Sequence, residues 1–107
     1  MIKKTLYSMH ADVCKALAHE LRIEIIDILK DRELTFGAIA EKTAVAKSNL
    51  SQHLSVMVQK GILMHRKEGL HVYYKLSSIK VYQAFQIMRE VLRERIRKEN
   101  DLINKFK

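Results

Sequence analysis

The stretch ELTFGAIAEKTAVAKSNLSQHLSVMVQKG, residues 33–61, decides the fold. Its apolar residues recur at helical spacing in two runs, which predicts two short helices joined by a tight turn, over about 35–42 and 47–60. Thr35 is a suitable N-cap for the first helix, and Gly61 suits the position just after the second. The side of the second helix opposite its apolar stripe carries one charge and otherwise short or amide side chains: Lys47, Ser48, Asn49, Ser51, Gln52 and Ser55.

This polar side favours DNA as a partner. Ser and Asn are weaker helix formers than the Glu and Lys that usually cover a solvated helix face. Together with Gln they can donate and accept hydrogen bonds at base edges in a major groove, a task for which Asn49 and Gln52 are best suited. Ala46 is a poor N-cap, so a DNA phosphate could supply the acceptor missing at this helix end. The alternative interpretation is a solvated face of poor helix propensity.

The flanking segments predict a mainly α domain with a small β-hairpin (α+β), in the order ααααββα. Helices are expected over about 6–18 and 20–30, the second apolar on almost every side and therefore central. Strands are expected over 62–67 and 71–76, with Gly69 in the turn between them. We expect residues 1–107 to form a single domain.

A long last helix is expected from residue 78 onward, and its apolar stripe is too long for a domain of this size to cover. The first helix could add a second apolar surface to the same interface, so we expect a homodimer built on these two helices. The stripe consists of Val81, Phe85, Met88, Leu92 and Ile96, with Leu102, Ile103 and Phe106 as its continuation.

Charge is unevenly distributed along the chain. The net charge is +8, with residues 1–34 neutral, residues 35–76 at +4 and residues 77–107 at +4. The excess begins with the helix pair, which favours a polyanion, nucleic acid before an anionic membrane. One cysteine permits no intrachain disulfide, and no apolar run has the length of a signal peptide core or a membrane span. We therefore expect a cytoplasmic protein that does not bind membranes.

Enzyme and cofactor motifs are missing from the sequence. It has no glycine-rich phosphate loop, no nucleophile elbow and no HExxH pair. The carboxylates alternate with Lys or Arg in solvated segments instead of forming a sequestered pair. We expect no enzyme activity, no cofactor and no metal.

Taken together, these segments resemble the winged helix-turn-helix repressors of the ArsR/SmtB family over roughly residues 13–76. KALAHELRIEIIDIL (15–29) is similar to the family's LA-x-x-x-R-x-x-I-L block, although Glu20 stands where the family usually has Pro. SNLSQHLSVMVQKGIL (48–63) is similar to the recognition helix, S-x-x-S-x-HL-x-x-L-x-x-x-G-L. RKEGLHVYYKL (66–76) is similar to the wing. The spacings between these blocks also fit the family.

The resemblance implies a transcriptional repressor that binds a palindromic double-stranded DNA operator as a homodimer. The recognition helix, about 47–60, would enter the major groove, with half-sites about one turn (~34–36 Å) apart. The wing, 62–76, would contact the backbone or minor groove. For His53, a phosphate contact and packing beneath the helix are both open. The candidate DNA-binding residues are Lys47, Ser48, Asn49, Ser51, Gln52, His53, Lys60, Arg66, Lys67 and His71.

The resemblance also implies an inducer that releases DNA, yet the family's usual sensing residues are missing. The family's ELCVCDL block reads ELTFGAI here, so Thr35 and Gly37 stand at the cysteine positions. No histidine follows His71, which removes the second family metal site. Cys14, with His10 four residues earlier, has three interpretations: a buried apolar residue, a thiol sensor or intersubunit pair, or a metal site shared across a dimer. A small-molecule or redox inducer stays unidentified.

A second class of function is also open. The chain could be a winged-helix protein-interaction or anionic-surface-binding module that uses its basic C-terminal helix, RERIRKENDLINKFK, to dock on an acidic partner or anionic lipid. Sequence-dependent DNA binding with a steep salt dependence would favour the regulator over this alternative.

Overall fold

The computed structural model describes residues 5–105 of the chain. Its helices and strands appear in the predicted order, with one additional strand, and their bounds agree with the predicted ones to within two residues. The elements are α1 (Leu6–Leu17), α2 (Glu20–Leu29), β1 (Leu34–Thr35), α3 (Phe36–Thr43), α4 (Lys47–Gln59), β2 (Leu63–Glu68), β3 (His71–Leu76) and α5 (Ile79–Lys105). The mainly α fold with a winged helix-turn-helix is therefore confirmed.

Strand β1 corrects the predicted order, because the hairpin is in fact part of a three-stranded sheet with strand order β1-β3-β2. Leu34 and Thr35 pair antiparallel with Tyr74 and Tyr73 of β3. A two-residue strand leaves no alternating pattern in a sequence, so periodicity could not reveal it. The Thr35 hydroxyl also accepts a hydrogen bond from Ala38 N at 3.1 Å, which confirms Thr35 as the N-cap of α3. The start of the helix-turn-helix is thus tied to the hairpin.

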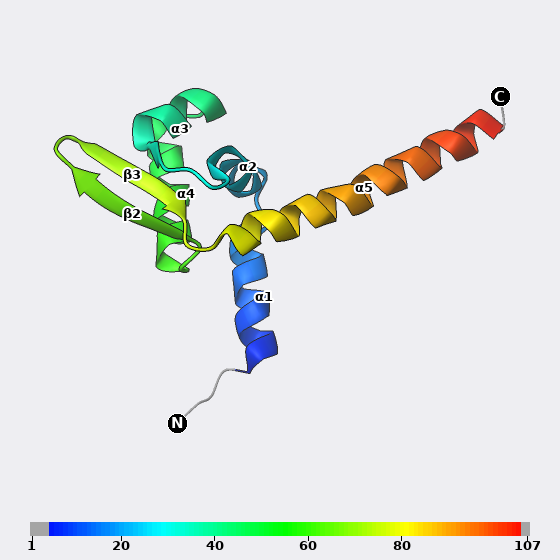
Figure 1. Cartoon of the computed structure of the whole chain (residues 1–107), viewed down its shortest axis with the longest axis horizontal. Coiled ribbons are helices and arrows are strands. Elements are labelled where there is room, and N and C mark those ends of the chain that lie inside the picture. Colours follow the sequence, from blue (N-terminus) through cyan, green and yellow to red (C-terminus); the bar gives the residue numbers. More distant parts are fainter. Residues whose placement is uncertain (1–4, 106–107) are drawn as a thin grey trace.

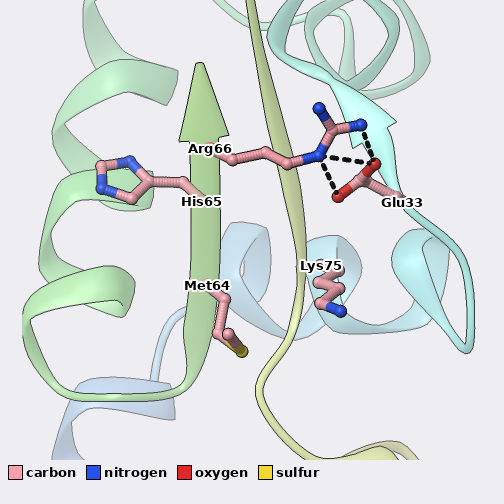
Figure 2. Close-up of a pocket in the computed structure, with 5 residues that line it drawn as sticks. All are labelled: Glu33, Met64, His65, Arg66 and Lys75. Atoms are coloured by element: carbon pink, nitrogen blue, oxygen red, sulfur yellow. Dashed lines mark hydrogen bonds and ion pairs between the residues drawn. The ribbon is translucent and has the colours of Figure 1, made fainter. Parts of the chain in front are cut away.

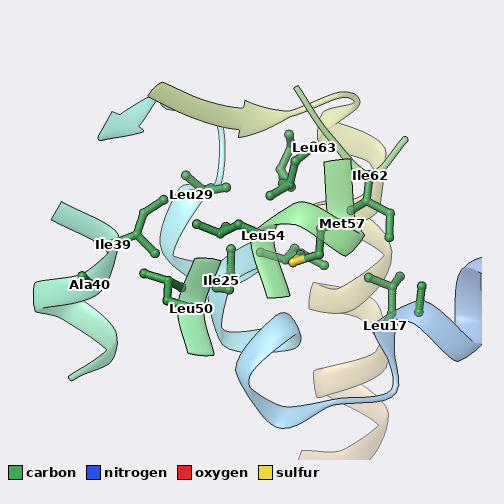
Figure 3. Packing of buried hydrophobic residues seen from close by; sticks show 13 residues of the cluster. Leu17, Ile25, Leu29, Ile39, Ala40, Leu50, Leu54, Met57, Ile62 and Leu63 are labelled. Carbon is green, nitrogen blue, oxygen red and sulfur yellow. The ribbon is translucent and has the colours of Figure 1, made fainter. Parts of the chain in front are cut away.

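The hydrophobic core lies where α2, α3 and α4 meet the sheet (Figure 3). Burying one Leu or Ile side chain contributes about 1.5–3 kcal/mol, so these contacts fix α4 against α2 and α3. One expectation needs correction: Ile23 on α2 is 38% exposed, so α2 is not covered on every side. The fully buried large side chains are Ile25, Ile26, Leu29, Ile39, Leu50, Leu54 and Met57.

The turns on either side of α4 use left-handed backbone. Ala44 ends α3 at φ 56°, and Gly61 follows α4 at φ 76°. Gly69, at φ 60°, is the first residue of the two-residue turn between β2 and β3. A positive φ at that position fits a type II′ hairpin turn, which glycine adopts without steric cost.

Helices α1 and α5 project away from this body in different directions (Figure 1). At the start of α5, Val81 and Phe85 pack against the core, and Arg89 pairs with Asp27 of α2. Phe106, predicted to extend the α5 stripe, lies outside the described residues. Within residues 5–105, no helix combines the length and apolar character needed to cross a bilayer.

Candidate nucleic-acid interface

Helix α4 presents its polar side to solvent and its apolar side to the core, as the sequence predicted. Leu50, Leu54 and Met57 have no exposed surface, and Val58 is half-buried against the core. The polar side of α4, which carries a single charge, therefore forms one continuous exposed face along the helix. Its exposed residues are Lys47, Ser48, Asn49, Ser51, Gln52 and Ser55.

The N-terminus of α4 lacks a side-chain cap. Ala46 occupies the cap position with φ −59° and ψ 137°, and no side chain accepts a hydrogen bond there. The first N–H groups of a helix have no partner within the helix and carry partial positive charge. Lys47 is exposed in the first turn of the same helix. This end of the helix can therefore receive a phosphate oxygen.

His53 is half-buried beneath the exposed face, the position expected for packing. Its Nδ1 accepts a hydrogen bond from Arg22 Nε at 2.9 Å, and its ring lies 5.6 Å from the ring of His19, edge to face. Burial lowers the pKa of His53, and the charges of Arg22 and His19 lower it further. Because Nδ1 is already occupied, a phosphate could reach only the other ring nitrogen.

The wing, which we define as β2, β3 and the turn between them (residues 63–76), carries exposed polar side chains toward its tip. Lys67 and His71 are exposed on neighbouring strands, where Lys67 pairs with Val72 and Glu68 with His71. Leu70 in the turn is 96% exposed. In the β2–β3 ladder, Leu63 pairs with Leu76 and both side chains are buried, so the base of the wing is anchored in the core.

Arg66 is held by protein carboxylates, which the sequence did not predict (Figure 2). Its Nη2 donates to Glu33 Oε1 at 2.7 Å, its Nε donates to Glu33 Oε2 at 3.1 Å, and its Nη1 pairs with Glu68. The guanidinium also lies 4.4 Å from the ring centre of Tyr73. The hydrogen bond from Arg66 lowers the pKa of Glu33, and the two carboxylates raise the pKa of Arg66.

Lys60, another candidate DNA-binding residue, also has a carboxylate partner. Its Nζ lies 3.2 Å from Asp12 Oδ2, and both side chains remain partly exposed at 38% and 42%. The exposed Lys60–Asp12 pair contributes little to stability, so Lys60 could exchange its carboxylate for a phosphate at small cost. No sequence pattern links residues 48 or 33 positions apart, which is why neither pair was predicted.

The structure corrects one interpretation of Cys14. The thiol is exposed on α1, so within this chain Cys14 is not a buried apolar residue. His10 is exposed on the same helix. Across the described residues, no group of three or more His, Cys, Asp or Glu side chains is arranged to hold a metal ion.

Large apolar side chains are exposed along α1 and α5. Leu6 and Met9 on α1 are 77% and 53% exposed. Where α5 leaves α2, a small apolar cavity of about 150 Å³ is lined by Ile23, Phe85, Met88, Arg89 and Leu92. The exposed apolar residues of α5 past its first turn are Ile87, Met88, Val91, Leu92, Ile96, Leu102 and Ile103.

Comparison with known sequences identifies relatives. The family model described as "Bacterial regulatory protein, arsR family" matches residues 19–64. The chain is 35% identical over 77 residues to the transcriptional activator HlyU of Vibrio cholerae, which is 72% of this chain and 71% of that protein. It is 33% identical over 67 residues to the transcriptional repressor SdpR of Bacillus subtilis, which is 63% of this chain and 74% of that protein.

Solved structures give the same picture. HlyU from Vibrio cholerae superposes with a TM-score of 0.75 at 30% identity, covering 83% of this chain and 97% of that one. The homodimeric winged helix-turn-helix DNA-binding domain of Mb0332 from Mycobacterium bovis superposes with a TM-score of 0.73 at 29% identity. That match covers 88% of this chain and 92% of the other.

Proposed function

The chain belongs to the arsR family of bacterial regulatory proteins, and we propose that it regulates transcription by binding a palindromic DNA operator as a homodimer. The observation that carries this proposal is the exposed face of α4, where short polar and amide side chains stand opposite fully buried leucines. A helix of this kind can approach base edges closely and hydrogen-bond to them. Such a regulator acts in the cytoplasm and needs no enzyme activity.

In the proposed complex, α4 lies in the major groove. Asn49 and Gln52 read base edges, while Lys47, Ser48 and Ser51 contact bases or the nearby backbone. The uncapped N–H groups at Ala46 take a phosphate oxygen, for which the helix dipole is favourable. These assignments are supported by exposure on one face and by the chemistry of the side chains.

The wing contacts the backbone or the minor groove beside α4. Lys67 and His71 are exposed on the strands of the wing and can approach phosphate. These contacts fix the register of the protein on the duplex without reading its base sequence. Arg66 reaches phosphate by releasing Glu33 and Glu68, and Lys60 reaches it by releasing Asp12. In the free protein, Arg66 instead holds the wing against the start of the helix-turn-helix.

Two copies are joined through the exposed apolar faces of α1 and α5. A solvated apolar surface of this extent is unfavourable on a monomer, and a second copy covers it symmetrically. This pairing accounts for the apolar side of α5, so docking on an acidic protein or lipid is not needed to explain it. With the two copies related by a two-fold axis, the operator half-sites fall about one helical turn apart.

We favour repression as the outcome of binding, because occupying a promoter is enough to exclude polymerase. The named relatives include both an activator and a repressor. Thr35 and Gly37 offer no thiolate, so an inducer would have to bind somewhere other than the family's cysteine site.

Fluorescence anisotropy with a labelled duplex pool at several salt concentrations tests this function. We expect binding that weakens steeply as salt increases, because lysine and arginine contacts release counterions from the phosphates. A selected duplex should bind at least ~1,000-fold more tightly than random DNA. Failure to bind any duplex, together with binding to anionic vesicles, would overturn the proposal in favour of the surface-binding alternative.

A further inference from the structure

Arg22 is an unusual residue in this fold because its charge is buried. Among residues 5–105 it is the one polar or charged residue that is buried, with 9% of its surface exposed. Removing a guanidinium from water is costly unless its donors are satisfied. Its Nη1 donates to Ala16 O at 2.8 Å and its Nε donates to His53 Nδ1 at 2.9 Å. Neither of these partners is a carboxylate, so simple charge neutralisation does not explain its position.

These two hydrogen bonds join three helices at one point. Ala16 lies in the last turn of α1, where carbonyl groups lack partners within the helix. Arg22 lies in the first turn of α2, and His53 lies in the middle of α4. The guanidinium therefore connects the end of α1, a helix of the proposed dimer interface, to α4. The exposed polar side of α4 is the proposed reading face: Lys47, Ser48, Asn49, Ser51, Gln52 and Ser55.

We propose that Arg22 is a positioning residue for α4, acting through a hydrogen bond that requires His53 to be unprotonated at Nδ1. This inference rests on the proposed function, because the position of α4 relative to α1 sets where each reading face lies about the dimer axis. A lost hydrogen bond at this junction leaves α4 packed on its leucines but less precisely oriented. Sequence-specific contacts then suffer more than contacts with phosphate.

The chemistry of histidine makes this connection sensitive to pH. Arg22 Nε is a donor, so His53 must offer a lone pair at Nδ1 and carry its proton on the other nitrogen. A protonated ring would have no lone pair there and would set two cations against each other. Burial, Arg22 and His19 all lower the pKa of His53, consistent with a neutral ring at pH 7.

Basic groups of α2 face His53, whereas Arg66 of β2 and Asp12 of α1 have other partners. From α2, Arg22 and the preceding His19 face the ring of His53. From β2, Arg66 is directed toward Glu33 instead (Figure 2). From α1, Asp12 pairs with Lys60 just after the end of α4. Protonation of His53 is therefore opposed first by burial and then by the charges of Arg22 and His19.

The test compares affinity for a selected operator with affinity for random DNA between pH 5.5 and 8, at constant ionic strength. The informative variant is His53→Asn, because its amide oxygen can take the place of Nδ1 as acceptor and does not titrate. We expect the operator preference of the wild type to fall at least about tenfold, relative to His53→Asn, as the pH falls through the lowered pKa of His53.

Arg22→Met provides the second arm, with Arg22→Lys as the conservative replacement. If Arg22→Met folds, it should reduce operator preference at pH 8, and the pH profile of that preference should no longer depend on whether residue 53 is His or Asn. Arg22→Lys should restore part of the preference and part of its pH dependence. If Arg22→Met does not fold, the comparison with His53→Asn still decides. Identical pH profiles for wild type and folded His53→Asn, both bound to the operator, would overturn this inference alone. Absence of any operator binding would overturn the proposed function and the positioning role with it.

Discussion

Single side chains on α4 and the wing have separable tasks in the proposed complex. The exposed polar side of α4 could be predicted from sequence because a 3.6-residue period separates Leu50 and Leu54 from Asn49 and Gln52 without any tertiary information. The partners of Arg66 and His53 could not be predicted in this way. Glu33 and Arg22, respectively, lie more than 30 residues away from them along the chain. Local periodicity assigns faces of helices, but it does not pair distant polar groups.

Gln52→Ala tests base reading by a single residue. We expect a loss of roughly 1–3 kcal/mol for the specific operator and almost none for random DNA, if the amide makes a bidentate base contact. Lys67→Ala is the matched comparison, because loss of a phosphate contact should weaken both duplexes about equally. Titration of both variants against both duplexes measures this, and equal losses for Gln52→Ala on the two duplexes would remove Gln52 from the reading face.

The Glu33–Arg66 pair predicts how stability depends on pH in the acid range. Arg66 lowers the pKa of Glu33 in the folded chain, so the ionised carboxylate favours folding above the ordinary value of 4.5. This contribution is lost as the pH falls through the lower folded value. We therefore expect wild-type stability to decline more between pH 5 and pH 3 (roughly) than that of Glu33→Gln.

Urea unfolding at a series of pH values measures this difference. Glu41→Gln, which removes an exposed carboxylate on α3, serves as the control and should follow the wild-type curve. Parallel curves for wild type and Glu33→Gln would contradict a role for the pair in holding the wing.

At the scale of elements, the helix-turn-helix and the wing form a connected unit. The helices were predictable because their apolar residues recur with a regular period, and the observed bounds lie within two residues of the predicted ones. Strand β1 was not predictable, because Leu34 and Thr35 show their strand character only by pairing with β3. That pairing connects the start of α3 to the wing, so the two proposed contact regions for DNA are held in one arrangement.

The uncapped start of α4 predicts a trade between stability and DNA binding. Ala46→Asp should stabilise the free protein by roughly 0.5–2 kcal/mol, because its carboxylate accepts from the first N–H groups and suits the helix dipole. The same carboxylate should weaken binding to every duplex by occupying and repelling the phosphate position. Thermal unfolding and anisotropy measure the two effects.

Ala46→Ser separates the cap from the charge. A neutral cap should stabilise the free protein to a similar extent but weaken DNA binding less than Ala46→Asp does. Wild-type affinity in a stabilised Ala46→Asp protein would contradict phosphate binding at this helix end.

At the scale of the whole molecule, α5 extends far from the body of the domain in Figure 1, and we propose that a second copy covers it. Helix α5 spans 27 residues, and past its first turns its apolar side has no partner within the described chain. The sequence predicted this exposed apolar surface because the stripe on the last helix is longer than a domain of this size can cover. The angle between the two copies could not be predicted, since it depends on how α1 and α5 of both chains pack together.

Leu92→Glu tests this interface. Leu92 is 47% exposed and lines the apolar cavity beside α2. Burying an unpaired carboxylate costs several kcal/mol, so the dimer dissociation constant should rise at least about tenfold and operator affinity should fall with it. Gln83→Glu adds the same charge to an exposed position on α5 outside the stripe and should leave the dimer intact. Sedimentation equilibrium in which the wild type is a monomer at micromolar concentration would contradict the homodimer.

The most direct test of the account is selection of bound sequences from a random double-stranded DNA pool, repeated with and without candidate metals and oxidants. The account predicts enrichment of a two-fold symmetric site, with half-sites about 10–10.5 base pairs apart between centres. Protection from cleavage should cover both major-groove half-sites on one face of the duplex. A pool that shows no enriched sequence after repeated rounds, although the protein is folded and dimeric, would contradict it.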